Sequence, residues 1–136
     1  MTQRPHYLLL GGLAAILFAT ATKAPAQTVP NPNLWYRLTT LFRGANVAMD
    51  VINDGTNNNR MHMVPAGPYT GQYWKFTPFP GYPGRYRISC MWQGDNLPMD
   101  IINGGPDNNF PILAPIGPYS GQAWLLVDEP AAPDYV

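Results

Sequence analysis

The feature that most constrains the fold is an internal repeat with a spacing of 50 residues. When residues 36–76 are aligned without gaps to residues 86–126, 18 of the 41 pairs are identical. The strongest matches are residues 49–55 against 99–105 and residues 67–74 against 117–124. Identity at a constant offset indicates a duplication, so most of the chain consists of two similar units.

Each unit shows the pattern of four short strands separated by turns. In the first unit we expect strands at residues 35–42, 47–52, 60–64 and 72–77. Gly44 and the Asn53–Gly55 triplet suit turns, while Pro65 and Pro78 end strands because proline donates no backbone hydrogen bond. Sustained helical periodicity is lacking after residue 26, and four Trp, eight Tyr and five Phe indicate an ordered core. The sequence therefore predicts an all-β fold.

The first 26 residues have the pattern of an export signal. Arg4 precedes the apolar run Leu8–Ala19, and Ala24-Pro25-Ala26 places small residues before a cleavage site. That run is shorter than the about 20 residues that span a membrane. We expect a signal peptide cleaved near Ala26 and a secreted or periplasmic protein, with an uncleaved anchor as the alternative. The rest divides into a linker (27–33), repeat 1 (34–83), repeat 2 (84–128) and a tail (129–136).

Charge and cysteine content narrow the function classes. Eight Lys and Arg balance eight Asp and Glu, and without the leader six basic side chains face eight acidic ones. A nucleic-acid partner is therefore not expected, because such proteins carry a basic surface. Cys90 is the only cysteine and lies in an apolar stretch, which predicts a buried structural thiol. An intermolecular disulfide is the alternative.

Two motifs recur in register in both units. Gln-x-Trp occurs at residues 72–74 and 122–124, and an Asp between apolar residues lies 22 positions ahead of each Gln, at Asp50 and Asp100. In four-strand units of this length, the combination resembles the ricin B-chain lectin family, especially its bacterial members without disulfides. The resemblance covers about residues 34–127.

The resemblance implies a β-trefoil, which is built from three such units around a pseudo-threefold axis. Two units are recognisable here, so we expect a β-trefoil-like fold with two of the three four-strand lobes. Such an arrangement exposes strand edges. We expect another copy of the chain or another protein to cover the open side, unless the sequence is a fragment of a longer, three-repeat product.

The resemblance also implies one shallow sugar site in each repeat. Asp50 and Asp100 match the aspartate that accepts hydrogen bonds from vicinal sugar hydroxyls; the alternative is that they stabilise their own turns. Gln72 and Gln122 match the motif glutamine, which either contacts sugar or has a structural role. Asn53 and Asn103 offer amides to the ligand or to the turn in the same way. We expect Trp74 and Trp124 to pack in the core.

The aromatic ring that stacks on sugar is where this sequence departs from the family. The lectins usually carry it at the end of the third strand, where this chain has Val64 and Ala114. Tyr69 and Tyr119, in the Gly-Pro-Tyr-Thr/Ser-Gly loops, are the candidate substitutes. A π-surface suits the C–H face of a pyranose. The alternative is that each Tyr closes its loop by packing on the repeat.

Catalytic and metal-binding patterns are missing from the sequence. His62 is the only histidine after the leader and its repeat counterpart is Ile112, so no histidine cluster is expected to hold a metal. Ser89, Ser120 and Cys90 lack a recognisable general base in a motif. We therefore expect neither an enzyme nor a cofactor. The expected function is weak, multivalent carbohydrate binding, and the alternative is a structural or protein-interaction module that has lost sugar binding.

Overall fold

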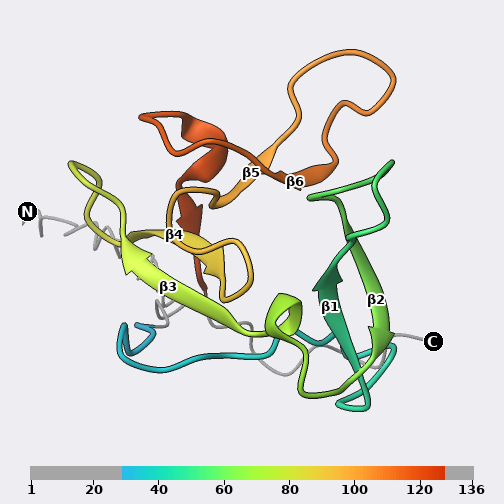
Figure 1. Cartoon of the computed structure of the whole chain (residues 1–136). Coiled ribbons are helices and arrows are strands. Elements are labelled where there is room, and N and C mark those ends of the chain that lie inside the picture. Colours follow the sequence, from blue (N-terminus) through green and yellow to red (C-terminus); the bar gives the residue numbers. More distant parts are fainter. Residues whose placement is uncertain (1–28, 128–136) are drawn as a thin grey trace, which may run out of the picture.

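The computed structural model describes residues 29–127, and its regular elements are strands and two short 3-10 helices (Figure 1). The expected leader and the tail at 129–136 lie outside the described residues. The elements are β1 (Val47–Val51), β2 (Met61–Pro65), η1 (Thr70–Gln72), β3 (Trp74–Pro78), β4 (Arg85–Cys90), β5 (Met99–Ile101), β6 (Pro111–Leu113), η2 (Ser120–Gln122) and β7 (Trp124–Leu125). The all-β prediction is confirmed. None of the helices between residues 29 and 127 is long and apolar enough to cross a membrane.

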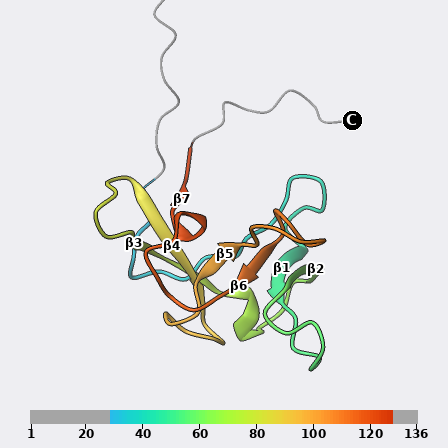
Figure 2. The ribbon, with the colours of Figure 1, turned by 90° about the horizontal axis from the view of Figure 1, so that it is seen from above.

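The described residues form three small antiparallel sheets, and two of them are equivalent hairpins that reflect the duplication in the sequence. Hairpin β1–β2 belongs to repeat 1 and hairpin β5–β6 to repeat 2, with equivalent pairs such as Val51↔Met61 and Ile101↔Pro111. The third sheet has the order β3-β4-β7. Figure 2 shows the β1–β2 hairpin and the β3–β4 pair on opposite sides, with β5 and β6 between them.

The central sheet joins the two repeats. β3 is the last strand of repeat 1 and pairs with β4, the first strand of repeat 2, from Trp74↔Cys90 to Pro78↔Tyr86. β7, the last strand of repeat 2, pairs with the other edge of β4 over only two residues. The extended pairing therefore lies at the junction between the repeats.

Two of the four expected strands of repeat 1 differ from the structure. The run 35–42 is not a strand: within it Tyr36 alone forms a bridge, to Trp74, with N···O distances of 2.7 and 2.8 Å. The fourth strand begins at Trp74 instead of Gln72, because Thr70–Gln72 form η1. The hairpin strands 47–52 and 60–64 agree with β1 and β2 to within one residue at each end.

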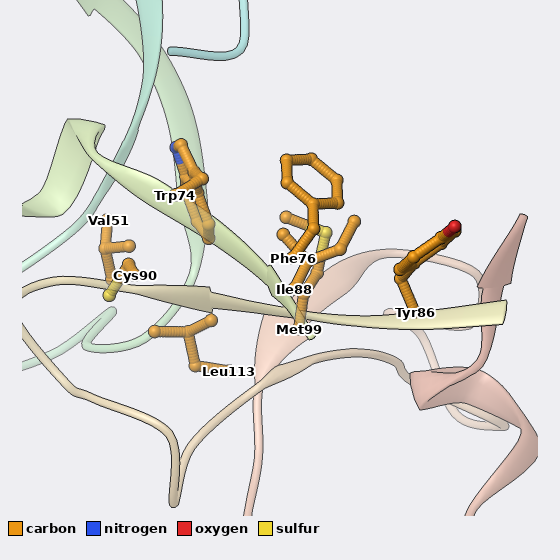
Figure 3. Packing of buried hydrophobic residues seen from close by; sticks show 8 residues of the cluster. All are labelled: Val51, Trp74, Phe76, Tyr86, Ile88, Cys90, Met99 and Leu113. Atoms are coloured by element: carbon orange, nitrogen blue, oxygen red, sulfur yellow. The ribbon is translucent and has the colours of Figure 1, made fainter. Parts of the chain in front are cut away.

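The core sits at the same junction. Figure 3 shows its eight buried members, among which Phe76, Ile88 and Met99 crowd together; the others are Val51, Trp74, Tyr86, Cys90 and Leu113. The prediction that Trp74 is buried is confirmed. Trp124 also packs against the cluster, as expected, but it stays partly exposed.

The lone cysteine belongs to this core. Cys90 is free and completely buried, as expected for a structural thiol. Burial raises the pKa of the Cys90 thiol because the thiolate would lose its hydration.

Candidate functional site

In repeat 1, a buried glutamine holds an aspartate at the surface. Gln72 is fully buried, and its Nε2 donates hydrogen bonds to Asp50 Oδ2 and to the carbonyl oxygen of Pro65, both at 3.1 Å. Its Oε1 accepts a bond of 2.9 Å from the backbone N–H of Gly67. Asp50 Oδ1 accepts a further bond of 2.7 Å from the N–H of Val51. The carboxylate is thereby fixed in one orientation.

Repeat 2 reproduces this network residue by residue. Gln122 Nε2 donates to Asp100 Oδ2 and to the carbonyl oxygen of Pro115, both at 2.9 Å. The N–H groups of Gly117 and Ile101 donate to Gln122 Oε1 and Asp100 Oδ1 at 3.1 and 2.7 Å. The Asp–Gln spacing of 22 residues in the sequence therefore corresponds to a hydrogen-bonded pair in each repeat.

A glycine ahead of each glutamine makes room for the carboxylate. A methyl group on Gly71 would overlap Asp50 Oδ1, and one on Gly121 would overlap Asp100 Oδ1. Any side chain there would push the aspartate out of its bonds. The Gly-Gln pair of the repeated motif thus shapes the site on which Asp50 and Asp100 lie.

The loop tyrosines lie beside these aspartates and are exposed. Tyr69 and Tyr119 are 59% and 58% exposed. Each ring covers the glycine two residues before it, so closely that a methyl group on Gly67 or Gly117 would overlap the ring. The glycine and the intervening proline therefore hold the tyrosine as a platform on the surface.

Each aspartate shares a shallow pocket with its tyrosine. The first pocket has a volume of about 430 Å³ and is lined by Asp50, Val51, Asn53, Pro68, Tyr69, Thr70, Gly71 and Trp92. The second has a volume of about 260 Å³ and is lined by Asp100, Ile101, Asn103, Tyr119, Ser120 and Gly121. The structure therefore brings together three of the four candidate residues in each repeat, the Asp, the Asn and the Tyr.

The fourth candidate, the glutamine, lies behind the pocket. Gln72 and Gln122 are fully buried and use both their amide oxygen and their amide nitrogen within the protein. Their surroundings favour the structural role that the sequence left open. They reach a ligand only through the aspartates that they orient.

The pockets retain hydrogen-bonding capacity. The Asp50 and Asp100 carboxylates each accept two protein hydrogen bonds, which leaves about two of their four acceptor positions free. Neither belongs to an ion pair among residues 29–127. The side-chain amides of Asn53 and Asn103 make no hydrogen bond within the same range. Each pocket thus offers a carboxylate, an amide and the hydroxyl of Thr70 or Ser120 beside an aromatic ring.

Sequence reasoning missed Trp92 in the first pocket. Trp92 is 36% exposed and comes from repeat 2, where it follows β4. Its backbone N–H donates to the carbonyl oxygen of Thr70 at 3.2 Å, and this bond ties Trp92 to the rim of the repeat 1 pocket. Motifs within one repeat could not predict this contact, because Trp92 belongs to repeat 2 and lines the pocket of repeat 1.

Other residues considered from the sequence have different surroundings. Val64 and Ala114 line neither of the two Asp–Tyr pockets. The three consecutive asparagines at residues 57–59 form their own turn, with Asn58 Oδ1 accepting from Gly55 N–H and Asn57 Nδ2 donating to Asp54. His62 is exposed on β2. In the part of the chain that the structure describes, no three His, Cys, Asp or Glu residues gather to hold a metal ion.

Comparison with known proteins adds no relative. No family model, no curated protein and no solved structure matches the chain at a significant level. The two pockets and the repeated motifs are therefore the features from which a function can be proposed.

Proposed function

We propose that the chain is an exported, non-enzymatic carbohydrate-binding protein with one shallow site in each repeat and a β-trefoil-like arrangement of those repeats. The first site consists of Asp50, Asn53 and Tyr69, with Trp92 at its rim. The second consists of Asp100, Asn103 and Tyr119. The observation that carries the proposal is the duplicated pocket, in which the same three residue types meet twice.

The chemistry of the pockets suits a pyranose. A fixed carboxylate accepts hydrogen bonds from two neighbouring hydroxyls, and charge-assisted bonds of this kind are stronger than neutral ones. An exposed aromatic ring packs against the apolar C–H face of the sugar. In this assignment the carboxylate determines which hydroxyls are bound, and Tyr69 or Tyr119 supplies the apolar contact.

Shallow sites of this kind bind weakly. Single-site dissociation constants of roughly a millimolar correspond to about −4 kcal/mol. Two sites in one chain raise the apparent affinity for a repeating glycan or polysaccharide, because binding at the first site raises the local concentration of ligand at the second.

A glycan array tests the proposal. The parent chain should bind a subset of glycans, and the double variant Tyr69→Ala/Tyr119→Ala should lose most of that signal while keeping its fold, since both rings are exposed. Tyr82→Ala is the matched control, because Tyr82 is 62% exposed and lines neither pocket. Equal binding by parent and double variant would place the sugar elsewhere.

A second candidate function is protein interaction without sugar binding. The observation that favours it is the apolar surface near the end of repeat 2, where Leu125 and Val127 are exposed beside the partly exposed Trp124. A parent chain that stays silent across a broad array, yet associates through this surface, would favour the second function over the first.

A further inference from the structure

Two segments with matching sequence have different structures. Residues 36–39 read Tyr-Arg-Leu-Thr and residues 86–89 read Tyr-Arg-Ile-Ser. The second segment lies in β4, a six-residue strand with β3 on one edge and β7 on the other. The first makes one bridge, to Trp74, and is otherwise outside any strand. Since the two local sequences are similar, we attribute the difference in structure to the neighbouring strands.

Strand β4 has β3 on one edge and β7 on the other, whereas the segment at 35–40 has a strand on one edge only within the described residues. Through the Tyr36–Trp74 bridge it lies beside β3, so the order across the sheet is 35–40, β3, β4, β7. At the other end, β4 is the only strand that the described part of the chain pairs with β7. Within residues 29–127, no further strand pairs with the outer edge of 35–40 or with the outer edge of β7, and these two edges lie at opposite ends of the same sheet.

These two edges are complementary, because the junction between the repeats already pairs their counterparts. At that junction Trp74 pairs with Cys90, Lys75 with Ser89 and Phe76 with Ile88. We replace each β3 residue by its counterpart 50 positions later and each β4 residue by its counterpart 50 positions earlier. The equivalent pairs are then Trp124↔Thr40, Leu125↔Thr39 and Leu126↔Leu38. One chain supplies the β7 edge and a second copy supplies residues 35–40.

Apolar exposure agrees with this pairing. Tyr86 and Ile88, which face the junction core, are buried, whereas Tyr36 and Leu38 are only partly buried. Trp74 is fully buried, whereas its counterpart Trp124 is partly exposed. In each pair, the member that the junction covers is the more buried one.

The same register would place an aromatic residue of the second copy on the pocket of Asp100 and Tyr119. At the junction, the backbone N–H groups of Met91 and Trp92 donate to the carbonyl oxygens of Tyr73 and Thr70, which places Trp92 on the first pocket. The counterparts are Leu41 and Phe42, which are 79% and 89% exposed. The second pocket is smaller and has no aromatic residue in the position that Trp92 takes in the first.

We propose that the β7 edge of one chain binds residues 35–42 of a second copy in this register, so that Phe42 of the second copy lies on the pocket of Asp100 and Tyr119. The contact is head-to-tail, and the smallest ring that it closes contains two chains. The pairing itself is independent of sugar binding, whereas the role of Phe42 at the pocket rests on the proposed function.

Cysteine cross-linking between two single variants tests the register. Full-length Thr39→Cys and Leu125→Cys chains, each expressed with its own leader, are mixed and oxidised mildly. Directly paired residues on antiparallel strands have Cα atoms at a distance that a disulfide accepts. Thr39→Cys mixed with Thr56→Cys is the control, since Thr56 lies in the exposed loop after β1. Cys90 is buried and stays in all the variants.

We expect the matched pair to give about tenfold more mixed disulfide than the control pair, because docking raises the local thiol concentration. Sedimentation of the parent chain should show a dimer or a larger assembly at tens of micromolar. A purely monomeric parent, or equal cross-linking by the two mixtures, would overturn the proposal. A dimer in which only identical cysteines cross-link would also overturn it, since that contact is not head-to-tail.

A second readout concerns the pocket. In an Asp50→Ala background, which silences the first site, Phe42→Ala should weaken binding of an array-positive glycan severalfold. Phe110→Ala is the matched control, because Phe110 is 57% exposed and lines neither pocket. An unchanged affinity together with the expected cross-link would remove Phe42 from the site and leave the strand pairing in place. Absence of glycan binding in the parent would count against the proposed function alone.

Discussion

At the scale of single residues, the side-chain amides of Gln72 and Gln122 connect the fold to the two pockets. Each buried amide joins the aspartate of the second strand to the backbone of the following loop. Because a buried polar group is costly when unpaired, this network fixes both the loop and the carboxylate. The same hydrogen bonds thus serve stability and, through Asp50 and Asp100, the proposed binding site.

Replacing Gln72 by Ala should lower the free energy of unfolding by about 2–4 kcal/mol, because three backbone and side-chain partners lose their bonds in a buried place. Urea denaturation measures the change. Gln93→Ala is the control, since the only side-chain bond of Gln93 within residues 29–127 joins it to Asn59. A loss no larger for Gln72→Ala than for Gln93→Ala would contradict the assigned role.

Cys90 gives a prediction on reactivity and pH. Burial raises its pKa above the ordinary thiol value, so the folded chain holds the thiol proton more tightly than the unfolded chain does. This contribution to stability is present at neutral pH and is lost as the pH rises through the raised pKa. At pH 8 an aromatic disulfide reagent should react roughly a hundredfold more slowly with folded than with urea-unfolded chain. Equal rates would show an accessible thiol.

At the scale of elements, one motif adopts two structures. Tyr-Arg-Ile-Ser forms strand β4 because β3 and β7 flank it, whereas Tyr-Arg-Leu-Thr has β3 on one edge only. Strand formation here is a property of the neighbours more than of the residues. Comparing the two segments within one chain therefore isolates the effect of the neighbouring strands.

The effect of the neighbouring strands can be measured by substituting Ile88 and its repeat counterpart Leu38. Ile88 is buried in the core, so Ile88→Ala should cost about 3 kcal/mol of unfolding free energy. Leu38 is its repeat counterpart and only partly buried, so Leu38→Ala should cost less than half of that in dilute solution. The difference should narrow as the concentration rises if a second copy covers Leu38. Equal costs at all concentrations would contradict the assigned burial.

The sequence predicted the elements that depend on local pattern and failed on those that depend on neighbours. The strands 47–52 and 60–64 agree with β1 and β2, because turn residues and proline bound them locally. The strand at 35–42 failed because its second edge is unpaired in the described chain. Likewise Asp50, Asn53 and Tyr69 meet within one repeat, whereas Trp92 reaches the pocket from the other repeat.

At the scale of the whole molecule, duplication accounts for both the core and the two pockets. The extended core forms where repeat 1 meets repeat 2, and each repeat keeps its own pocket on the surface. A chain with two weak sites gains from ligands that repeat, and a head-to-tail assembly would multiply the number of sites. Under the proposed function, the size of the assembly sets the apparent affinity for a repeating glycan.

The most direct test of the central claim is a titration of the chain with a panel of monosaccharides, at up to about 50 mM, followed through the indole N–H signals in NMR spectra. Trp92 lines the first pocket, whereas the indoles of Trp74 and Trp124 donate to the carbonyl oxygens of Met49 and Met99 and serve as internal references. Carbohydrate binding predicts that a subset of sugars shifts Trp92, together with the backbone signals of Asp50 and Gly71, in a saturable way. Spectra that no sugar changes, or shifts confined to residues outside both pockets, would contradict it.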